Sequence, residues 1–588
     1  MHFSVGFGVA YPLMMGITRA LQAGWAIVQI PALFFYVYNH LIICWVLGMC
    51  PKTFRMDLHS LLDQQIETKP DNVALVYFGL SITYGRLGKM IDDTVSGLHN
   101  LGIKHGDIVS IALPTTPESI ALVYALNRLG AVACLINVLY TAKQVASIVN
   151  ATHSKMLFIM NFNVKATARV AYEMNVEHIV VMRGCEVFPK QVAFWYGFGE
   201  WFNGRKFAFL SDKRFKHWDN ILDFASDDRI DNYDWQENEP QMIFQTSGTT
   251  GISKGVLLTA ENIEQSKLAT CDFMNDLKRD DTVLDLMPIF AYYGFCTSIH
   301  LPLSLGVKVV IVPIWKPRDF IKIISKHKPQ HVFSTPSNWD TINKTYNQSY
   351  NLDFLKTVVV AGDVVKPDYE RDINGFLTSH GCNAQITKVY GMTETAGIIA
   401  ATPQKSAIKY ELGYSGFIMA NHEVKIINDE ICVCPSTKFH GYFENQKATN
   451  QLIREHDGKM WIHTGDVGRL TETGELFVVG RSKRMIVRYD GLKIFPVEIE
   501  IALRECPDVK DCAATGVIDT LHPQSTVPIA YVVLNKNRWS NKQRVYQYIK
   551  KYLPLYNQPH KIIFIKELPK NTMGKADFSK LNKFYEIV

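Results

Sequence analysis

One run of residues limits what this chain can fold into and bind more than any other. Residues 245–255, QTSGTTGISKG, contain five hydroxyl side chains, three glycines and one lysine, and no acidic residue. The apolar residues 242–244 before it predict a short strand, so the run is expected to be a loop that leaves a strand. Glycines let the backbone approach an anion closely, and N–H groups, hydroxyls and Lys254 can together surround phosphate oxygens. The sequence therefore favours a phosphate-binding loop without the Walker spacing, and a Ser/Thr/Gly-rich surface turn is the alternative.

The composition indicates large folded domains and argues against two kinds of site. The chain has 588 residues, 47% of them hydrophobic, which is enough for several buried cores. The net charge of +6 is spread along the chain, and no Lys/Arg block alternates with aromatic residues, so nucleic acid is not an expected partner. The eleven cysteines are scattered without paired zinc-ligand spacing.

Residues 1–52 differ sharply in composition from the rest of the chain. From Met1 to Pro51 there is no acidic residue, and Arg19 is the only Lys or Arg. A membrane-spanning helix needs about 20 apolar residues, so the segment predicts an apolar helical anchor that spans the membrane or lies in one leaflet. Lys52 and Arg55 follow at once, which by the positive-inside tendency keeps the downstream domain in the cytosol. An apolar hairpin packed onto the protein's own surface is the alternative.

From residue 53 onward, short apolar strands alternate with helical patterns. Strands are expected near 73–78, 81–84, 108–113 and 131–136, and helix signals lie between them. This alternation predicts doubly wound α/β subdomains.

Short motifs follow one another in order between residues 53 and 588. They are TSGTTGISKG at 246–255, YGMTE at 390–394, TGD at 464–466, GRSK at 480–483 with GLKIFPVEIE at 491–500, and PKNTMGK at 569–575. Together they resemble the adenylate-forming superfamily of acyl-CoA synthetases, beetle luciferases and peptide-synthetase adenylation domains. The resemblance implies a large α/β N-terminal domain of doubly wound subdomains at 53–480. A small, mobile α+β C-terminal domain is expected at 481–588, after the anchor at 1–52.

The resemblance also implies that a carboxylic acid is activated with ATP and Mg²⁺. Attack of a carboxylate on the α-phosphate brings two anions together, so the site must supply positive charge and oriented donors. Thr393 would donate to the α-phosphate and Glu394 would hold Mg²⁺, while a helix N-terminus with Thr393 as its N-cap is the structural alternative. The β,γ-phosphates would be held by Thr246, Ser247, Gly248, Thr249, Thr250, Gly251 and Lys254.

Other motif residues are implied to hold the rest of the nucleotide. Tyr390, with Gly362 and Gly391, would line a pocket for adenine. Asp466 would accept the two ribose hydroxyls, as carboxylates do in other nucleotide sites. Arg481 would donate to ribose or phosphate.

The last motif carries the implied catalytic lysine. Lys575 would reach the forming bond and contact the carboxylate and the α-phosphate together. It must then leave for the thiol of coenzyme A, which the family achieves by rotating the C-terminal domain about a hinge residue, here Lys483. Lys493 or Arg488 would then meet the phosphates of coenzyme A.

Three positions depart from the family pattern. Ser253 stands where a proline is usual, Arg484 stands where an acidic residue is frequent, and Ala291 replaces a histidine beside the acyl pocket. The aromatic and small residues of 287–295 favour an apolar acyl group.

We therefore expect a membrane-attached acyl-CoA synthetase for a fatty or other hydrophobic carboxylic acid, with its catalytic domain facing the cytosol. An acyl-AMP ligase that loads a carrier protein, an aryl-acid CoA ligase and a degenerate ATP-binding scaffold remain as alternatives.

Overall fold

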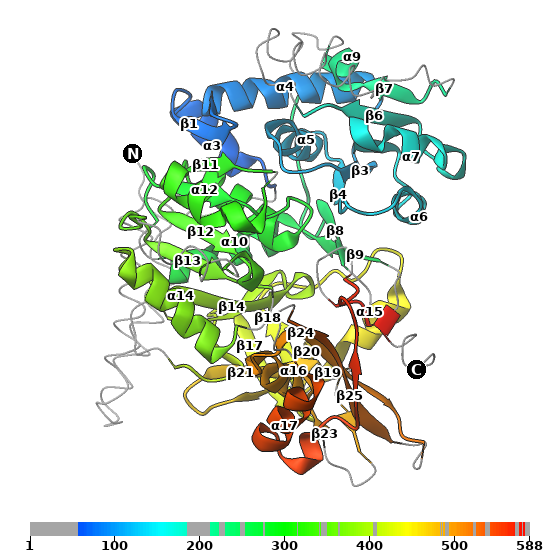
Figure 1. Cartoon of the computed structure of the whole chain (residues 1–588). Coiled ribbons are helices and arrows are strands. Elements are labelled where there is room, and N and C mark those ends of the chain that lie inside the picture. Colours follow the sequence, from blue (N-terminus) through cyan, green and yellow to red (C-terminus); the bar gives the residue numbers. More distant parts are fainter. Residues whose placement is uncertain are drawn as a thin grey trace, which may run out of the picture. The chain divides into compact units, whose positions relative to one another are not determined.

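The structure is a computed structural model whose described residues all belong to one compact unit, Met56–Val588. They are 57–184, 212–222, 230–246, 253–274, 277–313, 315–339, 342, 350–362, 365–403, 409–481, 484, 486–488, 493–520, 525–535, 541–570, 576–578 and 580–581 (Figure 1). The anchor predicted at 1–52 lies outside them. Within the described residues, no helix combines the length and apolar character needed to cross a bilayer.

A seven-stranded sheet contains the strands from β3 to β9, including the two on either side of the glycine-rich loop. In spatial order its strands are β7 (Phe215–His217), β6 (His178–Met182), β5 (Met156–Met160), β3 (Ile108–Ala112), β4 (Val132–Leu135), β8 (Met242–Thr246) and β9 (Lys254–Leu258). All neighbours are parallel except β8 and β9. Successive residues of β5 point to opposite faces of the sheet: Leu157 enters one hydrophobic core and Phe158 another. Both faces of this sheet are therefore buried.

A second sheet joins a parallel half to an antiparallel half. The parallel half comprises β1 (Val73–Tyr77), β11 (Lys308–Ile311), β10 (Thr282–Asp285), β12 (His331–Ser334), β13 (Thr357–Val360) and β14 (Ile386–Met392), and β2 (Leu80–Thr83) pairs antiparallel with β1. The antiparallel half comprises β15 (Gly397–Ala401), β16 (Tyr414–Ile418), β21 (Glu475–Arg481), β20 (Lys459–Leu470), β18 (Glu430–Pro435), β17 (His422–Ile427) and β19 (Ile453–His456). The chain changes from one half to the other at β14, the strand that ends within the YGMTE motif.

Helices cover the sheets, and several begin at a threonine that caps them. The hydroxyls of Thr116, Thr141 and Thr259 each accept a hydrogen bond from the backbone N–H three residues on, which fixes where α5, α6 and α10 begin. The longer helices are α3 (Ser60–Thr68), α4 (Tyr84–Asn100), α5 (Pro117–Arg128), α6 (Ala142–Ala151), α10 (Ala260–Phe273), α12 (Phe320–His327) and α14 (Pro367–Ser379). The shorter ones include α7 (Val164–Ala168), α9 (Trp218–Leu222), η3 (Gly294–His300), α11 (Leu301–Ser304) and α15 (Gln446–Leu452).

The end of the chain forms an α+β arrangement with cores of its own. Its sheet is β24 (Val509–Ile518), β25 (Thr526–Leu534) and β26 (Lys561–Phe564), with α16 (Pro496–Glu505), α17 (Lys542–Tyr552) and the hairpin of β22 (Ile486–Val487) and β23 (Lys493–Ile494) (Figure 1). Neighbouring residues Ala513 and Ala514 enter two separate hydrophobic cores, so this small sheet is also buried on both faces.

The α/β class predicted from the sequence is confirmed, and the first strands lie within one or two residues of their expected positions. The antiparallel half of the second sheet was not predicted. Its strands alternate buried and exposed residues too irregularly for a clear period of two, as in β20, where four consecutive residues from Trp461 to Thr464 are all buried.

A buried carboxyl group links β10 to the segment that follows it. Asp285 is 1% exposed, and its Oδ1 accepts hydrogen bonds from the Ser298 hydroxyl at 2.7 Å and the Met287 N–H at 3.3 Å. Burial raises the pKa of Asp285 to about 7, because these hydrogen bonds offset only part of the cost of burying a charge.

Asp285 is expected to make the stability of the fold depend on pH. Between about pH 4 and pH 7 the folded protein keeps a proton that the unfolded chain has released, so stability falls as the pH rises through this window. Asp285→Asn removes the titrating group and is expected to raise the melting temperature by a few degrees at pH 8 relative to the parent, with little gain at pH 4. Equal shifts at both pH values in thermal unfolding would contradict this assignment.

Candidate active site

The glycine-rich loop has both ends fixed in one ladder. Thr246 at the end of β8 is the register partner of Lys254 at the start of β9, so the loop leaves one strand and returns on its neighbour. The Ser253 hydroxyl donates to the Gln245 side-chain oxygen at 2.9 Å and to the Thr246 carbonyl at 3.0 Å. The predicted strand before the run is confirmed as β8, but β8 extends to Thr246 and β9 begins at Lys254, so both ends of the run belong to strands. Ser253, which stands at the family's usual proline position, joins these two ends through its hydroxyl. Ser247, Gly248, Thr249, Thr250 and Gly251 lie outside the described residues.

The YGMTE motif is a tight reversal between β14 and β15. A side chain at Gly391 would place its Cβ 2.1 Å from the carbonyl oxygen of Gly397, so only glycine fits there. Thr393 opens a single 3-10 turn, η6 (Thr393–Thr395), and the preceding Met392 is its N-cap residue, without a side-chain cap. The structural alternative, with Thr393 as an N-cap, is therefore wrong.

The motif's tyrosine and the TGD carboxylate are in direct contact. The Tyr390 hydroxyl donates to Asp466 Oδ2 at 2.6 Å, and Arg481 Nε lies 2.7 Å from Asp466 Oδ1. Asp466 is 4% exposed, whereas the Arg481 side chain is 57% exposed. Burial and the neighbouring carboxylate raise the pKa of Tyr390 well above its usual value, so Tyr390 stays a neutral donor. The result is a carboxylate held in one orientation by two donors, which suits it to accept hydrogen bonds from a sugar diol.

A hydrogen-bond network in the same sheet fixes the part of β20 that carries Asp466. Glu430 accepts from His463 Nδ1 at 2.7 Å through one oxygen and from the Gly465 N–H at 2.8 Å through the other. The Thr464 hydroxyl accepts from the Asp466 N–H at 3.0 Å. The side chains of Glu430, Cys432 and His463 also lie close enough together to be possible metal ligands. Each of their polar groups, however, already has a hydrogen-bond partner within this network.

Two further predicted residues are placed by backbone register. Val360 of β13 is paired with Lys388 of β14, so Gly362 and Tyr390, each two residues further on, lie at the same edge of the sheet. This position agrees with their predicted common pocket. Lys493 is in β23, but its side chain is outside the description, as are Lys483 and Lys575.

Glu394 and Lys254 are connected by a tyrosine that the sequence analysis did not identify. The Tyr442 hydroxyl donates to Glu394 Oε1 at 2.8 Å, and Lys254 Nζ lies 4.7 Å from the centroid of the Tyr442 ring. The sequence signal was weak, because a Gly-Tyr pair ahead of a short helix is common in proteins of every class.

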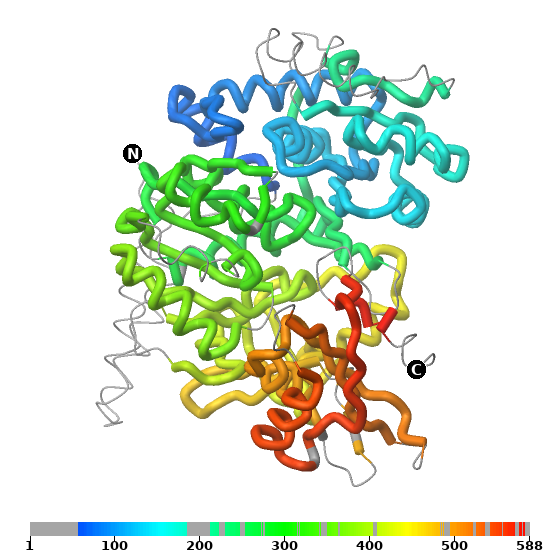
Figure 2. The backbone as a smooth tube through the Cα atoms, viewed as in Figure 1, coloured from blue at the N-terminus to red at the C-terminus, as the bar shows by residue number. Residues whose placement is uncertain are grey.

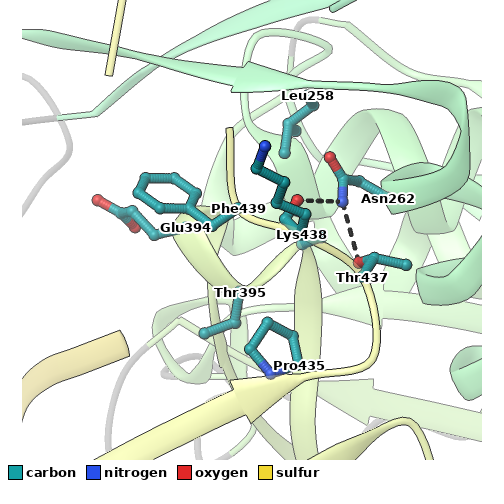
Figure 3. A pocket seen from close by; sticks show the side chains of 9 residues that line it. Leu258, Asn262, Glu394, Thr395, Pro435, Thr437, Lys438 and Phe439 are labelled. Atoms are coloured by element: carbon teal, nitrogen blue, oxygen red, sulfur yellow. Dashed lines mark hydrogen bonds between the residues drawn. The ribbon is translucent and has the colours of Figure 1, made fainter. Parts of the chain in front are cut away.

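Figure 3 shows a small recess beside Glu394. Asn262 Nδ2 donates to the Thr437 hydroxyl at 2.9 Å and to the Lys438 carbonyl at 3.1 Å, so α10 holds the 435–439 segment that forms one wall. The full lining is Leu258, Asn262, Glu394, Thr395, Ala396, Pro435, Thr437, Lys438 and Phe439. The recess reaches Glu394 but neither Tyr390 nor Asp466, so it is not a pocket for the whole nucleotide.

Known proteins are similar to this chain in sequence and in fold. The AMP-binding enzyme family matches residues 62–442, and the AMP-binding enzyme C-terminal domain matches residues 498–575. 4-Coumarate–CoA ligase 1 of Petroselinum crispum is 24% identical over 540 residues, covering 88% of this chain and 92% of that protein. 4-Coumarate–CoA ligase CCL1 of Humulus lupulus is 26% identical over 541 residues, with coverage of 88% and 92%. The crystal structure of the anthranilate CoA ligase AuaEII in complex with anthranoyl-AMP has a TM-score of 0.75 at 20% identity, covering 92% of this chain and 99% of that one, which shows a common fold.

If Asp466 holds the sugar of a nucleotide, neutralising it must weaken nucleotide binding. Asp466→Asn keeps the shape of the side chain but replaces an ionic acceptor, and the dissociation constant for ATP is expected to rise about tenfold or more. Isothermal titration calorimetry measures this directly. Asp457→Asn is the matched control, because Asp457 is an exposed carboxylate paired only at the surface with Lys425. An Asp466 variant that binds ATP as the control does would refute the role.

Proposed function

Because the chain belongs to the AMP-binding enzyme family, we propose that it joins a hydrophobic carboxylic acid to coenzyme A through an acyl-adenylate. The enzyme is an AMP-forming acid–CoA ligase that uses ATP and Mg²⁺. In the first step the carboxylate attacks the α-phosphate of ATP, forming acyl-AMP and releasing pyrophosphate. In the second step the thiol of coenzyme A displaces AMP and forms the thioester. The observation that carries the proposal is that the YGMTE motif contacts both other groups of candidate residues, with Glu394 connected through Tyr442 to Lys254 and Tyr390 bonded to Asp466, which also contacts Arg481.

The donor set at Glu394 fits a magnesium ion. One carboxylate oxygen accepts from Tyr442, and within the described residues the other, Oε2, has no hydrogen-bond partner. Mg²⁺ prefers oxygen ligands and is commonly held by one or two carboxylates together with substrate phosphates. When bound, the ion offsets phosphate charge; Glu394 would hold it and Lys254 would add a second positive charge at the loop.

The Asp466 contacts fit the sugar of ATP. Arg481 and Tyr390 each engage one oxygen of the Asp466 carboxylate and so fix its orientation for the ribose hydroxyls. Thr393 lies at the motif's turn, next to Glu394, where a hydroxyl can donate to the α-phosphate. These residues bind and orient the nucleotide; they do not form bonds with it.

We assign the amine at the forming bond to Lys575, which follows from the motif at 569–575. We further propose that residues 481–588 form a mobile domain that rotates about Lys483, so that Lys575 is replaced by the hairpin carrying Lys493 for the second step. The large domain would then be 53–480.

The acid is proposed to be hydrophobic, and an aryl acid is supported at least as well as a fatty acid. Behind β8, Phe244 packs edge-on against Tyr292 at 5.4 Å and tilted against Phe295 at 6.1 Å, and all three rings are buried. An aromatic substrate ring would extend this edge-to-face packing. The relatives that activate 4-coumarate support the same class.

Membrane attachment through residues 1–52, with the catalytic domain on the cytosolic side, is proposed from composition alone. The segment carries a single Lys or Arg before Lys52 and no acidic residue.

The activity is tested with a panel of aryl and straight-chain acids of graded length. Pyrophosphate release is expected only with ATP, Mg²⁺ and a hydrophobic acid, and mass spectrometry is expected to find an acyl-CoA. Lys575→Ala is expected to lower pyrophosphate release by about 100-fold or more while ATP binding stays within about threefold, because the lysine acts on the transition state. Release by no acid in the panel would contradict the function, and a product formed with a carrier protein but not with coenzyme A would identify the carrier-protein ligase.

Removing residues 1–52 tests the anchor. The shortened protein is expected to move from the membrane fraction to the supernatant and to keep its activity, because the described core begins after this segment. A shortened chain that remains with membranes, or that does not fold, would show that 1–52 has another role.

A further inference from the structure

Residues 441–443, which are far from the glycine-rich loop in sequence, are hydrogen-bonded to β9, the strand that follows the loop. The Phe443 N–H donates to the Gly255 carbonyl at 2.8 Å, and the Leu257 N–H donates to the Gly441 carbonyl at 3.1 Å. Tyr442 forms an isolated bridge with Val256 between them. The same approach is visible in Figure 2, where the yellow part of the chain before α15 comes close to β9. Tyr442 is therefore held at a fixed position relative to Lys254, the first residue of β9.

Each end of the Tyr442 side chain contacts a different charged group. Its hydroxyl donates to Glu394 Oε1 at 2.8 Å, and Lys254 Nζ lies 4.7 Å from the centroid of its ring. Tyr442 is 7% exposed, so the contacts are sheltered from water. Burial and the carboxylate raise the pKa of Tyr442 far above neutrality, and it remains a neutral donor.

The arrangement keeps a cation and an anion near each other without letting them pair. Within the part of the chain that the structure describes, Lys254 has no ion pair, although the carboxylate of Glu394 is held by the same tyrosine. A direct Lys–Glu pair sheltered from water would be stronger than a contact between an ammonium and an aromatic face. Such a pair would have to be broken each time a phosphate chain and its metal ion arrived.

We propose that Tyr442 is a positioning residue that separates Lys254 from Glu394 and presents both to Mg²⁺-bound ATP. Its ring holds the amine loosely for the phosphates, and its hydroxyl orients the carboxylate so that Oε2 faces the metal ion. This inference rests on the proposed function, because it takes Glu394 as the metal ligand and Lys254 as the phosphate contact.

Two substitutions test the hydroxyl and the ring of Tyr442 separately. Tyr442→Phe removes only the bond to Glu394, and the Mg²⁺ concentration for half-maximal ATP binding is expected to rise about fivefold, as for a lost hydrogen bond to a charged group. Tyr442→Leu also removes the ring and lets Lys254 pair with Glu394, so ATP affinity is expected to fall further, by about tenfold or more. Calorimetry without the acid measures both effects. Steady-state kinetics are expected to show a raised KM for ATP and an unchanged KM for the acid.

Tyr414→Phe is the matched control. Tyr414 is 6% exposed, its hydroxyl donates to Glu475 at 3.3 Å, and Lys388 and Lys409 lie 5.3 Å and 5.8 Å from its ring centroid. It repeats the chemistry of Tyr442 at a position away from the loop and the YGMTE motif. The control is expected to change the melting temperature without changing the Mg²⁺ requirement, and a purely structural Tyr442 would behave in the same way.

A second measurement compares the coupling of the two charges with and without Tyr442. Because both charges contact Tyr442, Lys254→Met and Glu394→Gln are expected to be coupled only weakly in the melting temperature of the ATP-free protein, and more strongly when Tyr442 is replaced by leucine. A coupling that is already as strong with Tyr442 in place as in the Tyr442→Leu background would show a direct ion pair and overturn the proposal. Identical Mg²⁺ titrations of Tyr442→Phe and Tyr414→Phe would also overturn it, whereas a parent protein that binds no ATP and releases no pyrophosphate would refute the proposed function itself.

Discussion

The close packing of Gly391 against Gly397 is the constraint on which the site depends. Because a Cβ at position 391 would lie 2.1 Å from the Gly397 carbonyl, the two strands can approach and reverse within the YGMTE motif only if that residue is glycine. The reversal sends the two functional side chains of the motif to different partners. Tyr390, before the turn, meets Asp466 on β20, and Glu394, within it, meets Tyr442 beside β9. The parallel half of the large sheet thus ends where the antiparallel half begins, and the binding groups gather at that change, as ligands do at the carboxyl ends of parallel strands.

Two carboxylates of the candidate site are held in the same way. Asp466 and Glu394 each accept a hydrogen bond from a tyrosine whose pKa is raised above its usual value. A neutral donor orients a carboxylate without cancelling its charge, which a lysine partner would do. Each carboxylate also has a cation close by, Arg481 in direct contact for Asp466 and Lys254 across the Tyr442 ring for Glu394. The charge of Asp466 is therefore compensated by direct contact with Arg481, whereas Glu394 has its cation only across the Tyr442 ring. Of the two carboxylates, Glu394 is the one suited to a metal ion.

The aromatic residues that pack against Phe244 of β8 are in contact with a group of buried polar side chains. Phe295 stacks on His300, whose ring nitrogens lie 3.0 Å from the Tyr124 hydroxyl and 3.1 Å from Glu264. Hydrogen bonding to His300 and the charge of Lys267 overcome the cost of burial and hold the pKa of Glu264 at about 2. The aromatic cluster around Phe244 is thus backed by a charge-compensated network of hydrogen bonds.

The sequence by itself determined the class of fold, the strand that precedes the glycine-rich run and the order of the motifs, because these depend on local patterns of glycine, hydroxyl and apolar residues. It also placed Asp466, Tyr390 and Glu394 among the candidate site residues. Only the tertiary structure decided which groups touch. The tyrosines that donate to Glu394 and Asp466 lie 48 and 76 residues away from them in the chain, and contacts over such distances leave no periodic signal. Tyr442 was missed for this reason: its role comes from the strand pairing that sets it beside Val256, not from the residues next to it in sequence.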